Sequence, residues 1–267
     1  MSTSYVHGYS EKEATRLCDQ AETLMEMLHR DTLYPSGSKV LEAGCGVGAQ
    51  TIALAKNSPE AAITSVDISL TSLRAASHRI GAGGVRNVTF QHADIFDLPF
   101  EDDCFDHVFV CYVLEHLEDP LTALDRLKRV LKPDGSITVI EGDHGSCFFH
   151  PGSIFARKAI EALVACQAKN GGNSLVGREL SPLLHMAGFR DIRVSPRMVY
   201  VDVSRPELVE GFTKKTFIAM VEGERDQAIA QGLIAEGEFD RGVNDLYRTA
   251  QPDGTFCYTF FKAVGLK

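Results

Sequence analysis

The chain has 267 residues, 44% hydrophobic and 24% charged, which is typical of a packed globular protein and excludes a wholly disordered one. The formal net charge of −9 argues against nucleic acid as a partner, because proteins that bind it usually present a basic surface to the phosphates. Seven cysteines without a CxxC pair, and no signal-like or long apolar segment, predict a cytoplasmic protein with reduced thiols and no membrane partner.

The chain opens with a predicted helix over residues 10–30. Ser10 followed by Glu13 forms a capping box, and apolar residues then recur at spacings of three or four. A Pro-Ser-Gly run breaks the chain before the next element. We therefore assign residues 1–35 to an N-terminal helix and flap.

Strands and helices alternate after this helix. The pattern predicts strands over 39–43, 62–67, 85–92, 105–112 and 136–141, separated in part by helices over 51–55, 69–80 and 121–131. This alternation predicts an α/β fold with a doubly wound, mostly parallel sheet. Right-handed crossovers would place the carboxyl ends of the parallel strands at one edge.

The last third of the chain has a different pattern. Residues 192–203 and 255–264 are β-rich and would complete a seven-stranded sheet, whereas residues 206–249 are helical and charged. We assign residues 36–205 together with 250–267 to the core. Residues 206–249 are then a helical lid inserted before the last strand.

A glycine-rich turn follows the first predicted strand directly. Glu42 precedes Gly44, Gly46 and Gly48, which gives the pattern E-x-G-x-G-x-G. Glycines let the backbone turn sharply and approach a ligand that a Cβ atom would block. Asp67 ends the second strand, where a carboxylate can bind both hydroxyls of a ribose.

The glycines and Asp67 alone also fit a dinucleotide such as NAD. The dinucleotide pattern, however, is G-x-G-x-x-G with a helix N-terminus open to pyrophosphate. Here the acidic Glu42 would repel phosphates and suits a ligand that carries an ammonium or sulfonium group. The turn therefore indicates a cationic nucleoside cofactor.

Four ordered motifs resemble those of class I S-adenosylmethionine-dependent methyltransferases, especially the small-molecule group related to quinone-biosynthesis enzymes, with a Rossmann-like fold. They are the glycine turn with Asp67, the His-Ala-Asp-Ile segment at 92–95, the fourth-strand segment at 105–117 and the Leu-Lys-Pro-Asp-Gly-Ser segment at 131–136. The resemblance covers roughly residues 38–142.

The resemblance implies S-adenosylmethionine as cofactor and S-adenosylhomocysteine as product. In that family the glycine turn faces the methionine moiety, the acid after the second strand holds the ribose, and an acid after the third strand contacts the adenine amine. The positions implied to bind cofactor here are Glu42, Gly44, Gly46, Gly48, Asp67, Ile68, Asp94, Ile95 and Cys111.

A base that accepts the substrate proton should stand at the carboxyl ends of strands four or five. Asp143 and His144 follow the fifth predicted strand, and a histidine with a reference pKa near 6.5 can take a proton at neutral pH. Alternatively, these residues cap the helix expected near Pro151. In relatives the N-terminal flap lies near the methionine end, which makes Tyr9 a further candidate.

We expect no metal, although His144, Cys147 and His150 have a ligand-like spacing that lacks a fourth partner. The predicted activity is methyl transfer to an O, N or nucleophilic C atom of a small, aromatic or heterocyclic metabolite. Alternatives are an RNA or protein methyltransferase and a non-catalytic S-adenosylmethionine-binding regulator. The chain would act as a monomer or homodimer.

Overall fold

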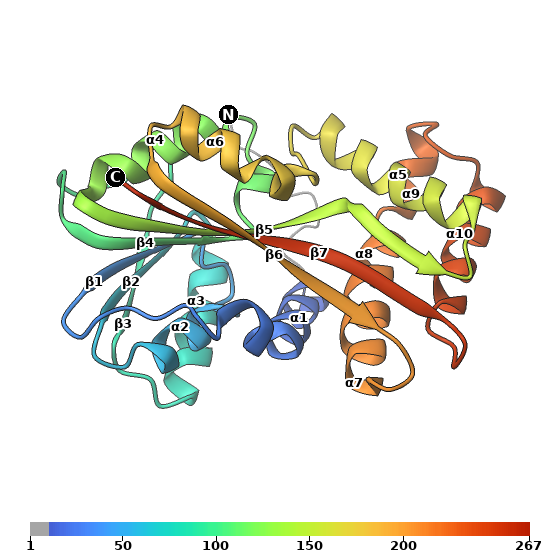
Figure 1. The fold of residues 1–267 in the computed structure, drawn as a ribbon, viewed down its shortest axis with the longest axis horizontal. Coiled ribbons are helices and arrows are strands. Elements are labelled where there is room, and N and C mark those ends of the chain that lie inside the picture. Colours follow the sequence, from blue (N-terminus) through green and yellow to red (C-terminus); the bar gives the residue numbers. More distant parts are fainter. Residues whose placement is uncertain (1–10) are drawn as a thin grey trace.

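The computed structural model describes residues 11–267 and contains a seven-stranded sheet with the strand order β3-β2-β1-β4-β5-β7-β6 (Figure 1). Neighbouring strands among β1 to β5 pair in parallel, and β7 is antiparallel to β5 and β6. This confirms the doubly wound, mostly parallel sheet. The strands are β1 (Lys39–Ala43), β2 (Ala62–Asp67), β3 (Val88–His92), β4 (Phe105–Cys111), β5 (Leu131–His150), β6 (Arg190–Val201) and β7 (Thr255–Leu266).

Helices cover both faces of the sheet: α4 and α6 lie on one face, and α1, α2 and α3 lie on the other (Figure 1). No helix within residues 11–267 is both long and apolar enough to cross a membrane. The helices are α1 (Glu11–His29), α2 (Thr51–Asn57), α3 (Leu70–Ala82), η1 (Leu114–His116), α4 (Pro120–Val130), α5 (Ile154–Lys169), η2 (Val176–Glu179), α6 (Leu180–Met186), α7 (Pro206–Leu208), the π-helix η3 (Val209–Ile218), α8 (Ala219–Gly223), α9 (Arg225–Ala230) and α10 (Glu236–Arg248).

The central strands form the core because their side chains are buried on both faces. Leu41 in β1 and Val108, Phe109 and Val110 in β4 have no measurable exposure. Local caps fix the crossover helices. Ser69 accepts a hydrogen bond from the backbone N–H of Ser72 and so caps the N-terminus of α3.

Strand β5 is much longer than the predicted 136–141, and this changes the setting of the two candidate catalytic residues. The strand continues to His150 because β7 supplies a pairing partner as far as Thr255. A β-bulge between Asp143 and Phe148 interrupts the regular pairing with β7, in a glycine-containing segment whose sequence is typical of a loop. Asp143 and His144 therefore lie within the strand, so the prediction that they follow it was wrong.

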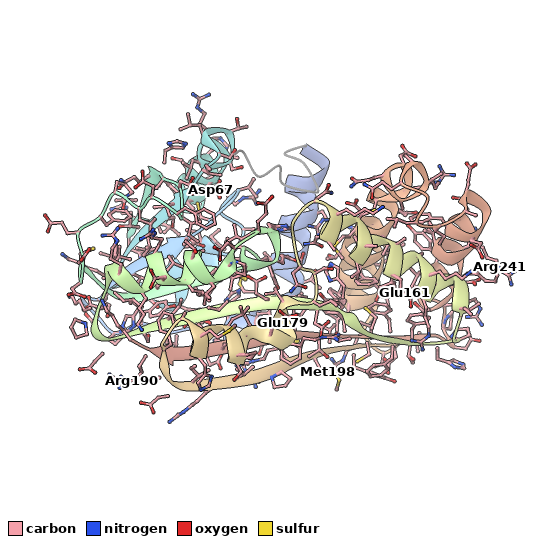
Figure 2. All side chains as sticks on the ribbon, turned by 90° about the horizontal axis from the view of Figure 1, so that it is seen from above. Asp67, Glu161, Glu179, Arg190, Met198 and Arg241 are labelled. Carbon is pink, nitrogen blue, oxygen red and sulfur yellow. The ribbon has the colours of Figure 1, made fainter. Side chains whose placement is uncertain are left out.

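Strand β6 runs without a break through Pro196, which pairs with Phe261 of β7. Proline lacks the N–H that an inner strand would need, but β6 is the last strand of the sheet and needs hydrogen bonds on one side only. The exposed side chain of Met198 lies on the opposite side of β5 from Asp67 (Figure 2).

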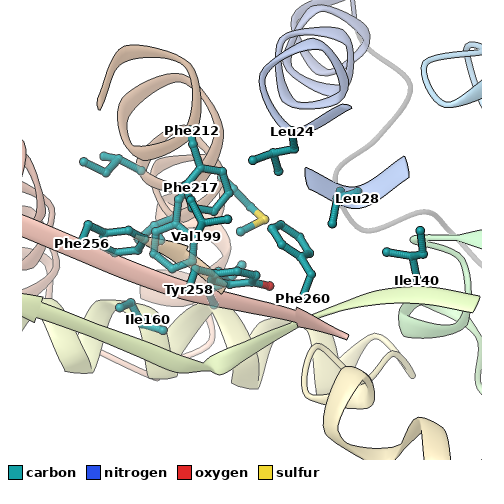
Figure 3. Close-up of a cluster of buried hydrophobic side chains, with 14 of the residues drawn as sticks. Leu24, Leu28, Ile140, Ile160, Val199, Phe212, Phe217, Phe256, Tyr258 and Phe260 are labelled. Atoms are coloured by element: carbon teal, nitrogen blue, oxygen red, sulfur yellow. The ribbon is translucent and has the colours of Figure 1, made fainter. Parts of the chain in front are cut away.

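The segment between β6 and β7 is helical, and its π-helix packs on β7. Phe212 and Phe217 of η3 contact the rings of Phe256, Tyr258 and Phe260, which alternate with outward-facing residues along the strand (Figure 3). These five aromatic side chains, which we call the aromatic cluster, are each at most 3% exposed. Their burial joins the helical segment to the extended part of β5 and β7.

Candidate functional site

The order of the strands reverses between β1 and β4, which lie side by side at the centre of the sheet. In an open α/β sheet such a reversal leaves a crevice outside the carboxyl ends of the strands, where ligands bind. The glycine turn follows β1 at this point, and Asp67 ends the neighbouring strand β2. The predicted cofactor residues thus meet at the expected place.

Each glycine of the turn has a positive φ, 74° at Gly44, 52° at Gly46 and 76° at Gly48, a conformation that side chains disfavour. A Cβ atom at Gly44 would lie 2.4 Å from Cγ2 of Val113. At Gly48 it would lie 3.1 Å from the backbone of Ala76 in α3. A Cβ atom at Gly46 would have no atom within 4 Å. The missing side chain at this position therefore leaves open space beside the turn and does not serve close packing.

Asp67 orders the turn through both carboxylate oxygens. Its Oδ2 accepts from the backbone N–H of Gly46 at 2.8 Å, and its Oδ1 accepts from that of Ser69 at 2.8 Å. Burial raises the pKa of Asp67, and these two hydrogen bonds oppose the rise. The carboxylate is therefore held at the tip of β2 and still has lone pairs for the hydroxyls of a ligand.

Glu42 lies beneath the turn and is only 2% exposed. Its Oε2 accepts from Thr51 Oγ1 at 2.7 Å and from Ser65 Oγ at 2.6 Å. Burial raises the pKa of Glu42 to about 7, despite these two hydrogen bonds. A buried carboxyl group with this pKa gains from a nearby positive charge and opposes a phosphate.

The remaining cofactor candidates lie at the ends of the neighbouring strands. Asp94, just after β3, shapes its own loop by accepting from Phe96 N at 2.9 Å. Ile68 follows Asp67 and is 55% exposed, so it offers an apolar surface, whereas Ile95 is half-buried. Cys111 ends β4 and is 8% exposed. All four lie at the ends of strands β2 to β4.

The helix α1 supports the turn from below. His29, at the end of α1, and Gln50, just before α2, form a hydrogen bond of 2.7 Å between Nε2 and Oε1. Burial lowers the pKa of His29 to about 4, so the ring is neutral in this contact. Asn57 of α2 also donates to the carbonyl of His29. The N-terminal helix therefore docks on the helix that follows the turn.

Asp143 and His144 do not form an acid-base pair, because neighbouring residues in a strand point to opposite sides. Asp143 is 2% exposed and accepts from Arg178 Nε at 2.8 Å and Nη2 at 2.7 Å. The backbone N–H of Gly145 donates to the same carboxylate. His144 instead meets Tyr258, with 2.7 Å between Nδ1 and Oη. Tyr9 lies outside the described residues.

Two residues near the turn, the acidic Glu141 and the aromatic Tyr112, were not among the predicted site residues. Glu141 of β5 is fully buried, which raises its pKa, and its Oε1 accepts from the backbone of Val113 and Leu114 at 3.0 and 2.8 Å. Tyr112, at the end of β4, has a φ of 58° that is unusual for a bulky residue. Both hold the segment that packs against Gly44.

Within residues 11–267, no group of three or more His, Cys, Asp or Glu side chains is arranged to hold a metal ion. The ligand-like spacing of His144, Cys147 and His150 thus produces no metal centre in the part of the chain that the structure describes.

Known proteins resemble part of the chain in sequence and most of it in fold. Residues 41–139 match the model of the family described as "Methyltransferase domain". A demethylmenaquinone methyltransferase from Staphylococcus aureus (strain JH9) is 34% identical over 124 residues, which are 46% of this chain and 51% of the relative. The match thus spans about half the length of this relative.

Two solved structures share the fold over more than 90% of this chain. The YcgJ protein from Bacillus subtilis has a TM-score of 0.58 at 18% identity, with 92% of this chain and 98% of that chain covered. Phosphoethanolamine N-methyltransferase 2 from Haemonchus contortus, in complex with S-adenosyl-L-methionine, has a TM-score of 0.57 at 19% identity, with 93% and 52% covered.

Proposed function

The chain carries a class I methyltransferase domain, and on that premise we propose that it transfers a methyl group from S-adenosylmethionine to a small molecule. One observation in particular supports S-adenosylmethionine as the cofactor. The buried carboxyl group of Glu42 lies beneath a glycine turn, where it opposes pyrophosphate and favours a cationic ligand. The complex of the Haemonchus contortus enzyme supports the same choice.

The proposed cofactor site is the crevice at the carboxyl ends of β1 and β4, without any rearrangement of its residues. Asp67 would bind the ribose hydroxyls, Gly46 provides the open space beside it, and Asp94 would take the adenine amine, with Ile68 and Ile95 along the ring. Gly44, Gly48 and Cys111 shape the wall near the methionine end. Bound S-adenosylmethionine supplies an activated methyl group, so the chain's main task is to position the acceptor.

We infer that the acceptor binds between the core and the helical lid. In this division residues 1–35 form the N-terminal helix and flap, residues 36–205 with 250–267 form the core, and residues 206–249 form the lid. The aromatic cluster joins lid and core, and in this proposal an aromatic or heterocyclic acceptor would bind beside it. His144 belongs to its edge, with its ring centroid 6.1 Å from that of Phe217.

Within this proposal His144 touches the acceptor and Asp143 orients the bulged segment through Arg178. The carboxylate of Asp143 accepts from two nitrogens of Arg178 and from the backbone N–H of Gly145, so in this proposal it orients the segment and does not contact the acceptor. Tyr9 remains a candidate contact from the flap.

Titration calorimetry tests the cofactor first, followed by a panel of methyl acceptors with detection of a mass increase of one methylene unit. We expect binding of S-adenosylmethionine and S-adenosylhomocysteine, no binding of NAD, and methylation of a phenolic or heterocyclic acceptor. Binding of NAD without S-adenosylmethionine would contradict the proposal. Binding without turnover on any acceptor would instead favour a regulator.

The pKa of Glu42 predicts how cofactor affinity depends on pH. Because the free protein holds this group protonated below about pH 7, binding of a cationic ligand must release its proton there. Affinity should therefore rise between pH 5 and 7, by at most about tenfold per pH unit from this group, and then level off. Calorimetry at several pH values measures the slope, and Glu42→Gln should flatten it. An equal slope in both proteins would exclude Glu42 as its source.

A further inference from the structure

We propose that Glu141 is a positioning residue of the cofactor site: from β5 it fixes the segment 112–114 that follows β4, and this segment holds the glycine turn in place. Cofactor affinity then depends on a fully buried side chain that acts on the turn through Val113. The link between Glu141 and the turn stands on the described residues alone, whereas its use for S-adenosylmethionine rests on the proposed function.

The segment 112–114 leaves the sheet where β4 ends. Cys111 is the last residue of β4 that pairs with β5, and the backbone N–H of Tyr112 donates to the carbonyl of Ile140 at 3.0 Å. The positive φ of Tyr112, 58°, then changes the direction of the chain. The next two N–H groups, those of Val113 and Leu114, stand at the start of the short helix η1, where a helix has no carbonyl of its own to offer them.

Glu141 supplies the missing acceptor from the neighbouring strand. Its Oε1 accepts from Val113 N at 3.0 Å and from Leu114 N at 2.8 Å. Valine has no polar side-chain atom, so Val113 at the N-cap position cannot provide this acceptor itself. Glu141 and Leu114 are both fully buried, and water therefore cannot take the place of the carboxyl oxygen. Without that oxygen, the two N–H groups can find partners only if the segment moves.

The glycine turn lies between β2 and this segment. On the side of β2 it is hydrogen-bonded, since the backbone N–H groups of Gly44 and Cys45 donate to the carbonyl of Val66 at 2.9 and 3.0 Å. On the side of β4 it packs against Val113, whose Cγ2, Cγ1 and Cβ lie 2.4, 3.2 and 3.4 Å from the position of a Cβ atom at residue 44. The side chain of Val113 thus fills the space that a side chain at Gly44 would need. A displacement of Val113 would release the turn on this side.

The role requires an oxygen that accepts hydrogen bonds and does not require a negative charge. Burial and, after it, the carboxyl group of Glu115 raise the pKa of Glu141, so a neutral group is not disfavoured at this position. Glutamine keeps one carbonyl oxygen at the same distance along the side chain and should replace Glu141. Methionine has a similar length without an oxygen and should not.

Two measurements on these variants test the proposal. Hydrogen exchange followed by NMR reports on the amides of Val113 and Leu114 in the free protein, and titration calorimetry gives the affinity for S-adenosylmethionine. In Glu141→Met we expect faster exchange at both amides and an affinity lower by about 10-fold or more, whereas Glu141→Gln should stay within about threefold of the unchanged protein. Normal affinity in a folded Glu141→Met, or equal losses in both variants, would overturn the proposal.

A matched control separates positioning from a general loss of stability. Leu246→Ala removes a fully buried side chain of α10, which lies at the opposite end of the molecule from β1 (Figure 1). This variant should be less stable but should bind the cofactor normally. If Leu246→Ala loses as much affinity as Glu141→Met, the effect is one of stability and the positioning role is wrong.

Val113→Ala tests the route to the turn and, with Glu141→Gln, decides if Glu141→Met does not fold. We expect weaker cofactor binding in Val113→Ala, and no further loss when Glu141→Met is added, because both changes act at one contact. Normal affinity in Val113→Ala, or losses that multiply in the double variant, would contradict the route. The exchange at Val113 and Leu114 needs no cofactor, so a chain that does not bind S-adenosylmethionine would contradict the proposed function and leave the exchange to decide on Glu141.

Discussion

Replacing Asp67 with alanine is expected to weaken S-adenosylmethionine binding by about 10- to 150-fold, or about 1.5 to 3 kcal/mol. Two effects add in this variant. The ribose loses a charged hydrogen-bond acceptor, and the backbone N–H groups of Gly46 and Ser69 lose the carboxylate that orders the turn. Titration calorimetry gives the dissociation constant of both proteins at one pH.

Two further variants identify the cause. Asp67→Asn keeps the shape and one carbonyl oxygen, so its affinity should fall between those of the unchanged protein and Asp67→Ala. Asp125→Asn changes an exposed aspartate of α4 that lies away from the crevice, and it should bind the cofactor normally. An unchanged dissociation constant for Asp67→Ala would remove the main support for the cofactor assignment.

Replacing Gly44 with alanine should destabilise the fold by about 3 to 5 kcal/mol. The new Cβ would lie 2.4 Å from Cγ2 and 3.2 Å from Cγ1 of Val113, so this stiff, branched side chain would have to shift or leave its preferred rotamer. The positive φ adds its own cost. Denaturant unfolding followed by circular dichroism measures the change.

Gly46→Ala is the matched control, since the residue has a positive φ but no atom within 4 Å of the new Cβ. Its stability should fall by only about 1 to 2 kcal/mol, while its affinity for S-adenosylmethionine falls because the methyl group enters the proposed ligand space. Equal stability of the two variants would mean that Val113 does not restrict position 44. Unchanged cofactor affinity in Gly46→Ala would place the ligand elsewhere.

The meeting of the glycine turn and Asp67 at one edge of the sheet could be predicted from the sequence because each of these elements is local. The glycine turn follows its strand directly, Asp67 ends the next strand, and the strand order of such folds brings these ends together. The buried setting of Glu42 could not be predicted. It depends on hydroxyls from Thr51 and Ser65, two residues whose side chains point inward only once α2 and β2 are in place.

The surroundings of Asp143 and His144 were predicted less well, since their contacts join distant parts of the chain. The glycines beside Asp143 and His144 resemble a loop, and only the pairing of β5 with β7 turns this segment into a bulged strand. Nothing near His144 in the sequence indicates Tyr258. A side-chain contact between residues more than a hundred positions apart is determined by strand register, which a single sequence does not display.

The register between β6 and β7 also bears on how such proteins diverge. Val201 and Phe256 are direct partners across the two strands, although the whole helical segment lies between them in the chain. Because the ends of this segment are fixed one strand spacing apart, a change in its length need not alter the pairing of the two strands. In the proposed function, which places the acceptor beneath this segment, recombination in this one segment would exchange acceptor preference and leave the crevice at the glycine turn unchanged.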